Sequence, residues 1–226
     1  MAMSGSSTVL RDGLLQGRSV LLAAAGVQGR GGPGAGALAE AVGEACANLG
    51  AQVLGISALS DQGAISPAEE GSVEEALRAL LGPSGAIDAV IIDAAGMFAA
   101  ASAGQGDTTG PAARDALSCA LAGSWNVARA VGNLAFMAGG HGGRIVLLAP
   151  SPGAGLHADA ARAGLENLAR TLSIEWARHR ITAVAVAPGD TTQPAVVATV
   201  AAFLASTAGS YFSGCLLDLR GPRAAV

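Results

Sequence analysis

The sequence contains no lysine, and all thirteen of its basic residues are arginines. Its only tyrosine is Tyr211, close to the C-terminal end. Chemistry that relies on a lysine ammonium is therefore excluded. A tyrosine phenol could take part in proton transfer only from the last residues of the chain.

Aromatic residues make up only 3 % of the chain, whereas hydrophobic residues make up 51 %. The core must therefore consist of Ala, Val, Leu and Ile, whose small side chains each bury little area. A length of 226 residues fits one domain of the α/β class. The formal net charge of −4 argues against a surface that binds nucleic acid.

Cysteine is scarce as well, and Cys46, Cys119 and Cys215 lie far apart in the sequence. No CxxC motif or Cys/His cluster indicates a metal site, so we expect small buried thiols in a reducing compartment and no metal. The N-terminus lacks the apolar run of a signal peptide, and no apolar stretch is long enough to span a bilayer. We therefore predict a cytoplasmic protein without membrane contact.

Short apolar segments alternate with helix-like segments along the chain. We predict strands at 19–25, 52–57, 89–92, 144–148, 182–187 and 215–219, and helices at 37–49, 72–81, 111–137, 158–178 and 194–205. A glycine-rich loop at 26–36 follows the first strand. This alternation predicts a Rossmann-like, doubly wound parallel sheet in a three-layer α/β/α arrangement. One domain is expected over 1–226, with an N-terminal tail at 1–16.

Several segments form a pattern that covers nearly the whole chain and is most specific in its last third. They are 163–178, 181–189 with its Pro-Gly turn, 201–206, 210–214 and 217–221, together with the looser segment 87–96. This pattern resembles the short-chain dehydrogenase/reductase family. The resemblance implies a Rossmann fold, NAD(P) as cofactor and a catalytic set of Asn, Ser, Tyr and Lys.

The four catalytic positions that the resemblance implies hold other residues here. Aligning on 163–165 puts Arg162 at the lysine position and Ala158 at the tyrosine position four residues earlier. Pro150 stands at the serine position and Ala120 at the asparagine position. The resemblance therefore implies a degenerate member without the standard catalytic residues.

Proton transfer is the step that these changes affect. Hydride transfer to a carbonyl requires a proton donor within hydrogen-bonding reach, and the family uses a phenol whose pKa the adjacent ammonium lowers. Alanine has no proton to give, and the planar guanidinium of Arg162 places its donors differently. His157, with Ser151 and Arg162 nearby, is an alternative acid because histidine titrates near neutral pH. We prefer the interpretation of His157 as a loop residue without a catalytic role.

The cofactor site implied by the resemblance is also eroded. Gly26 and Gly96 occupy glycine positions of the family, but the loop 26–36 is too long for the family's phosphate-binding turn. Pro33 removes a backbone N–H from that loop, and Ser66 stands where the family often has an adenine-contacting aspartate. We therefore expect no cofactor in this chain and treat both glycines as vestigial.

Two family segments are largely missing. After residue 189 the family inserts a helical lid over the substrate, whereas here 190–193 lead almost directly to the helix at 194–205. The helix between the second and third strands is replaced by 58–65. Without a lid, water is not excluded and substrate is not held.

The best-matching segments are those that make subunit contacts in the family. Helices 111–137 and 158–178 and the C-terminal segment are therefore expected to bind a catalytic homologue that carries NAD(P), for example in a two-subunit hydroxyacyl-CoA or alcohol dehydrogenase. The leading hypothesis is an inactive subunit of a heterodimer or heterotetramer. The alternatives are a homodimer, an active oxidoreductase that uses Ser151, His157 and Arg162, and a ligand-binding or regulatory pseudoenzyme.

Overall fold

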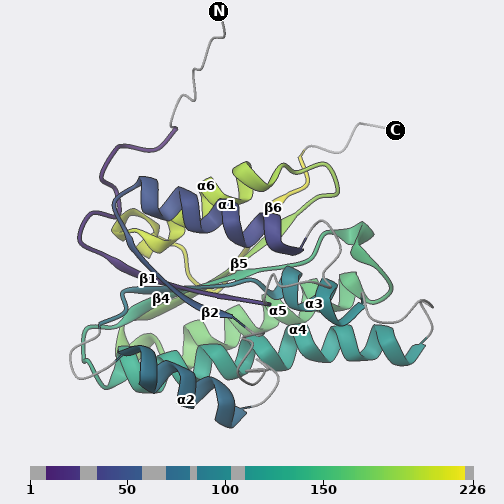
Figure 1. Ribbon diagram of the computed structural model, residues 1–226, viewed down its shortest axis with the longest axis horizontal. Coiled ribbons are helices and arrows are strands. Elements are labelled where there is room, and N and C mark those ends of the chain that lie inside the picture. The colour runs from purple at the N-terminus through teal and green to yellow at the C-terminus, as the bar shows by residue number, and fades with distance from the viewer. Residues whose placement is uncertain (1–8, 26–34, 58–69, 82–85, 103–109, 222–226) are drawn as a thin grey trace, which may run out of the picture.

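The computed structural model describes residues 9–25, 35–57, 70–81, 86–102 and 110–221 (Figure 1). Within them, six parallel strands form one sheet in the order β2-β1-β3-β4-β5-β6. The strands are β1 (Ser19–Ala24), β2 (Gln52–Ser57), β3 (Ala89–Ile92), β4 (Gly143–Leu148), β5 (Ile181–Pro188) and β6 (Cys215–Leu219). The predicted doubly wound parallel sheet is confirmed.

Helices cover both faces of this sheet. On one face lie α1 (Ala35–Asn48) and α6 (Pro194–Ala205), which pack on each other. On the other face lie α2 (Glu70–Leu81), α4 (Gly110–Val131) and α5 (Ala158–Glu175), and α3 (Ala94–Ser102) packs against α4 (Figure 1). The arrangement is the predicted three-layer α/β/α sandwich.

The central strand β3 shows why these segments form a buried parallel sheet. All four of its residues are fully buried, and successive side chains point to opposite faces. Ala89 and Ile91 join the core beneath α1 and α6, whereas Val90 and Ile92 join the core beneath α4 and α5. A strand without polar side chains is stable here because helices cover both of its faces.

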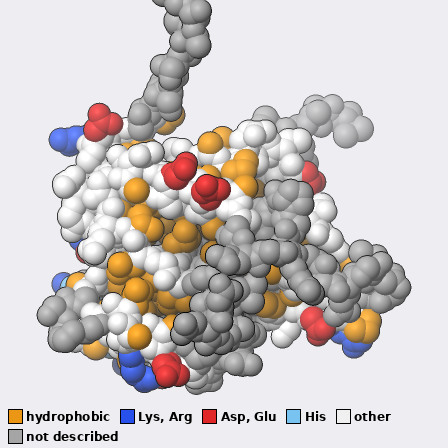
Figure 2. All heavy atoms as spheres, viewed as in Figure 1, with side chains coloured by type: hydrophobic (Ala, Val, Ile, Leu, Met, Phe, Trp, Pro, Cys, Tyr) orange, Lys and Arg blue, Asp and Glu red, His pale blue; other side chains and the backbone are white. Residues whose placement is uncertain are grey.

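The edge strand β2 is more exposed. Among the described residues it pairs with β1 alone, and its Val53 and Leu54 side chains are partly exposed. Figure 2 shows hydrophobic side chains at the surface between α1 and the helical layer that contains α2, α4 and α5. Residues 58–65, which were expected to replace a family helix, lie outside the described residues.

The largest difference from the sequence-based prediction is helix α3. The sequence pattern predicted no helix directly after the third strand, yet nine residues from Ala94 form one. Alanine has high helix propensity, and the Asp93 carboxylate accepts a hydrogen bond from the Gly96 N–H at 2.8 Å, which caps the helix. The helix ends at Ser102, and residues 103–109 are not described.

Helix boundaries differ from the prediction at several further places, including α2, which begins at Glu70 instead of residue 72. α1 begins at Ala35 instead of residue 37, and the predicted helix 111–137 is α-helical to Val131 and π-helical from Gly132 to Met137. The predicted helix 158–178 ends at Glu175, where Trp176 leaves the α-helical conformation. Helix ends and single turns of another helix type are set by local hydrogen bonding, which a hydrophobic pattern does not resolve to within one or two residues.

The expected N-terminal tail at 1–16 includes residues that pack on the fold. Leu15 is fully buried, and its N–H donates a hydrogen bond to the Leu49 carbonyl at 2.9 Å. Of the three cysteines, only Cys46 is buried, and its burial raises the pKa of the thiol to about 12. Burial raises the pKa of the half-buried Cys119 and Cys215 thiols as well.

Candidate functional site

A pocket of about 360 Å³ lies at the carboxyl ends of the strands, where parallel α/β sheets place their ligands. The ends of β4 and β5 contribute Pro150, Ser151 and residues 188–190. Helix α3 contributes Ala95, Gly96 and Ala99, and helices α1 and α6 complete the wall. We call this the carboxyl-edge pocket. Its described lining includes no arginine, histidine or tyrosine.

Arg162, at the predicted lysine position, is buried inside the protein and does not line the carboxyl-edge pocket. Its Nη1 donates to the Pro150 and Pro188 carbonyls, both at 2.7 Å, and so joins the carboxyl ends of β4 and β5. Burial, followed by the nearby Arg220, lowers the pKa of its guanidinium. The arginine therefore serves as a clamp between two strands, because its donors are directed at backbone.

The residues at the predicted tyrosine and asparagine positions are also buried away from the carboxyl-edge pocket. Ala158, at the start of α5, and Ala120, on α4, are both fully buried in the core cluster beneath that face of the sheet. Neither lines the carboxyl-edge pocket. Alanine at both positions supplies neither a phenol nor an amide there.

The alternative proton donors do not form a connected site. Ser151 lines the carboxyl-edge pocket, but His157 does not. His157 precedes α5 in a left-handed conformation with φ of 68°, and its side chain caps no helical N–H. Among the described residues, no hydrogen bond joins Ser151, His157 and Arg162, which would be needed for a proton relay.

The connection after β5 is short and closely held. Only residues 189–193 separate Pro188 from Pro194, the first residue of α6. Thr192 Oγ1 accepts a hydrogen bond from the Gly189 N–H at 2.9 Å and donates to the Leu219 carbonyl at 3.0 Å. This connection has too few residues to fold over the carboxyl-edge pocket.

Asp93 is a notable residue that the sequence reasoning did not single out. It follows β3 directly, is fully buried, and leaves its Oδ2 without a hydrogen-bond partner among the described residues. Burial raises the pKa of this carboxyl to about 7, although the hydrogen bond from Gly96 opposes the shift. The signal in the sequence was an aspartate between an apolar strand and an alanine-rich helix, which is typical of an N-cap.

Of the two glycines expected as vestiges of a cofactor site, only Gly96 lies within the described residues. Gly26, Pro33 and Ser66 fall outside the described residues. The Gly96 N–H is already bound to Asp93, so it is not free to bind a ligand. The described lining of the carboxyl-edge pocket has an apolar α3 wall and no cation, and the loop at 26–34 lies outside the described residues.

The expected partner surface on α4 and α5 carries exposed apolar side chains. Leu117, Leu121 and Trp125 follow at four-residue steps on one side of α4, and all three are at least partly exposed. On α5, Ile174 is 74 % exposed. The Trp125 ring lies 6.4 Å, centroid to centroid, from the ring of Trp176, the residue that follows α5, so the two aromatic side chains connect α4 with the end of α5.

Among the described residues, no group of three or more His, Cys, Asp or Glu side chains could hold a metal ion. No described helix is both long and apolar enough to cross a bilayer.

Comparison with known proteins identifies the relationship that this geometry suggests. The family model described as enoyl-(acyl carrier protein) reductase matches residues 34–196. A citronellol catabolism dehydrogenase of Pseudomonas aeruginosa PAO1 has a similar structure, with a TM-score of 0.72, 22 % identity and coverage of 94 % of this chain and 97 % of that chain. A short chain dehydrogenase from Mycobacterium smegmatis gives a TM-score of 0.70 and 23 % identity over 94 % of this chain and 95 % of that chain. No curated protein sequence matches the chain.

The solved structures establish the fold, and the family model covers more than half of the sequence. The chain therefore belongs to the short-chain dehydrogenase/reductase family.

Proposed function

We propose that this chain is a non-catalytic subunit that assembles with an active member of the same family. The observation that carries the proposal is the state of the two central catalytic positions. Ala158 is buried and has no dissociable proton, and the Arg162 guanidinium is bound to two backbone carbonyls. A carbonyl substrate in the carboxyl-edge pocket would therefore meet no positioned acid of the family's kind.

The proposal includes the absence of a bound nucleotide cofactor from this chain. The carboxyl-edge pocket offers apolar side chains and a Gly96 N–H that is already bound, and NAD(P) would be held by the partner subunit. What this chain supplies is a stable α/β body and a surface for assembly. A two-subunit dehydrogenase acting on an alcohol or a hydroxyacyl-CoA thioester fits this division of roles.

The surface of α4 and α5 is the proposed contact with the partner. Trp125 is 41 % exposed and is supported from behind by Trp176, which makes it a rigid aromatic anchor of the kind that dominates binding energy at interfaces. The half-exposed apolar strand β6 offers a second contact surface at the C-terminal end of the chain. Both surfaces belong to the segments that most resemble the family.

Co-expression with a homologue that carries the intact Tyr-x-x-x-Lys pair tests the proposal. We expect native mass spectrometry to show a complex of both chains, and NAD(P)-dependent turnover only when the homologue is present. A double substitution, Trp125→Ala with Ile174→Asp, should weaken the complex at least 100-fold, because it removes the anchor and places a charge in the interface. Val9→Asp, at another exposed apolar position, is the matched control and should leave the complex intact.

Turnover by the solitary chain would overturn the proposal. If that turnover were abolished by His157→Ala, the alternative oxidoreductase built on Ser151, His157 and Arg162 would take its place. If the chain formed a stable homodimer and bound none of the homologues co-expressed with it, a ligand-binding or regulatory role would be favoured instead.

A further inference from the structure

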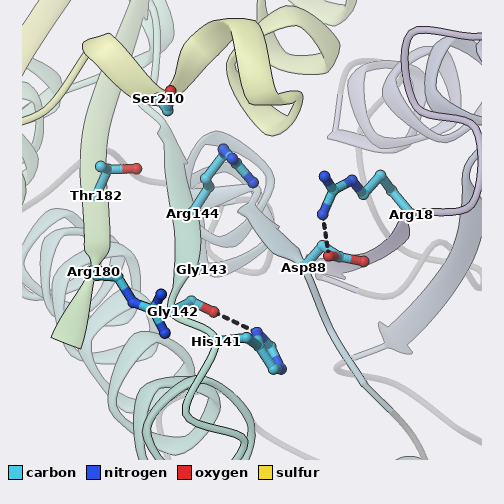
Figure 3. Close-up of a pocket in the computed structure, with 9 residues that line it drawn as sticks. All are labelled: Arg18, Asp88, His141, Gly142, Gly143, Arg144, Arg180, Thr182 and Ser210. Atoms are coloured by element: carbon cyan, nitrogen blue, oxygen red, sulfur yellow. Dashed lines mark hydrogen bonds and ion pairs between the residues drawn. The ribbon is translucent and has the colours of Figure 1, made fainter.

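A second pocket lies at the opposite edge of the sheet, where the strands begin (Figure 3). Its volume is about 140 Å³, and we call it the amino-edge pocket. Its principal side chains come from four separate parts of the chain: Arg18 before β1, Asp88 before β3, Arg144 on β4 and Arg180 before β5. His141 lies at the same rim.

The charge of the amino-edge pocket is unbalanced. Asp88 is the single carboxylate among its described lining residues, which also include three arginines. Both oxygens of Asp88 have partners, since Oδ1 accepts from Arg18 Nη1 at 2.7 Å and Oδ2 accepts from the Ser19 N–H at 2.9 Å. Arg180 donates to the Gly140 carbonyl, which is neutral and leaves the positive charge of Arg180 uncompensated.

Arg144 is the residue whose environment most clearly lacks an anion. It is half-buried, and its Nε is fully buried without a hydrogen-bond partner among the described residues. Burial lowers the pKa of its guanidinium, the positive charge of Arg18 lowers it further, and Asp88 opposes the shift only in part. A buried guanidinium nitrogen without an acceptor is costly, so an anion bound in the pocket would stabilise it.

The neighbouring groups suit an oxyanion. Figure 3 shows the Arg144 and Arg18 guanidinium groups extending into the space of the pocket and the Thr182 hydroxyl directed toward it from β5. Guanidinium groups bind phosphate and carboxylate oxygens through paired N–H donors, and the hydroxyl adds a further donor. The pocket volume of about 140 Å³ leaves room for one phosphoryl group.

We propose that the amino-edge pocket binds a phosphoryl group, as inorganic phosphate or as the phosphate of a small monoester, through Arg144, Arg180 and Thr182, with Arg18 held in place by Asp88. The site lies on the opposite edge of the sheet from the carboxyl-edge pocket and is independent of the function proposed above. It would place a ligand against β4 and β5 without approaching the positions aligned with family catalysis.

Isothermal titration calorimetry of the full chain tests this site, with sodium phosphate and glycerol 3-phosphate as the two probes. Sodium chloride keeps the ionic strength constant, so that screening of the arginines does not change during the titration. We expect saturable binding that Arg144→Gln weakens at least tenfold. Asp88→Asn should strengthen binding several-fold because it removes the one carboxylate found among the described lining residues. Arg114→Gln, at an exposed position near the start of α4, is the matched charge control and should bind like the parent protein.

Arg180→Gln provides a second test in case Arg144→Gln does not fold, and it should also weaken binding. Equal affinity for the two probes would support recognition of the phosphoryl group alone, and higher affinity for the ester would support a phosphorylated metabolite as ligand. The proposal is overturned if phosphate produces no binding beyond that of chloride, or if Arg144→Gln and Arg180→Gln bind phosphate as the parent does.

Discussion

Charged side chains at the amino and carboxyl ends of the strands differ in pairing and burial. The two aspartates that flank strand β3 show this difference. Asp88, just before β3, is paired with Arg18 and the Ser19 N–H. Asp93, just after β3, is fully buried with one oxygen unpaired, and burial raises its pKa to about 7. The same residue type is thus a salt-bridge partner at one edge and a buried carboxyl with a raised pKa at the other.

The arginines follow the same division. At the carboxyl edge, Arg162 is bound to two backbone carbonyls and is closed off from the pocket. At the amino edge, Arg144 and Arg180 line an open pocket together with Arg18. Among the described residues, therefore, Arg162 at the carboxyl edge is held by backbone carbonyls, whereas Arg144 and Arg180 at the amino edge line a pocket.

Asp93→Asn should have the largest effect on stability. The Asp93 carboxyl has a pKa of about 7 in the folded protein and an ordinary value of 3.8, so the folded state holds this proton more tightly. The resulting stabilisation is complete below pH 4 and is lost as the pH rises through 7, which amounts to about 4 kcal/mol. Asparagine keeps an acceptor for the Gly96 N–H but does not titrate. Urea unfolding at pH 4.5, 6 and 8 should show a much flatter pH dependence for the variant, and parallel profiles would contradict the prediction.

Arg162→Met should lower the free energy of unfolding by about 3 kcal/mol, because two buried carbonyls lose their donor. Arg162→Lys should recover part of this loss, since an ammonium can donate to one or both carbonyls. Arg170→Gln on the same helix breaks only an exposed pair with Glu166 and should change stability by no more than about 0.5 kcal/mol. Urea unfolding at pH 7 measures all three variants. If Arg162→Met and Arg170→Gln lowered the free energy of unfolding equally, the hydrogen bonds of Arg162 to the two carbonyls would not stabilise the fold.

Asp88→Asn should have the smallest effect, a loss of at most about 1 kcal/mol, because Arg18 is 37 % exposed and water already screens the pair. Raising the sodium chloride concentration to about 1 M should reduce this loss further, since the Debye length falls to about 3 Å. Urea unfolding at low and high salt provides the measurement. A loss as large as that of Arg162→Met would mean that the two edges do not differ in the way described.

Much of the architecture was predictable because it depends on local patterns. The predicted bounds of β2, β3, β6 and α6 coincide with those of the structure, since each is a mainly apolar segment with clear ends. Helix α3 was missed because a short alanine-rich segment after a strand has little amphipathic periodicity. The cap that starts it depends on how Asp93 lies in the folded chain.

The sequence by itself determined that Ala158 and Ala120 cannot donate or hold a proton, because that depends only on the chemistry of the side chain. It also determined the parallel sheet, because apolar strands that alternate with helices have few other ways to bury both faces. The tertiary structure alone decided that Arg162 binds backbone, that Asp93 is buried, and that Arg18, Arg144 and Arg180 meet at one edge. These properties depend on groups far apart in the sequence, whose hydration and neighbours exist only once the strands have paired.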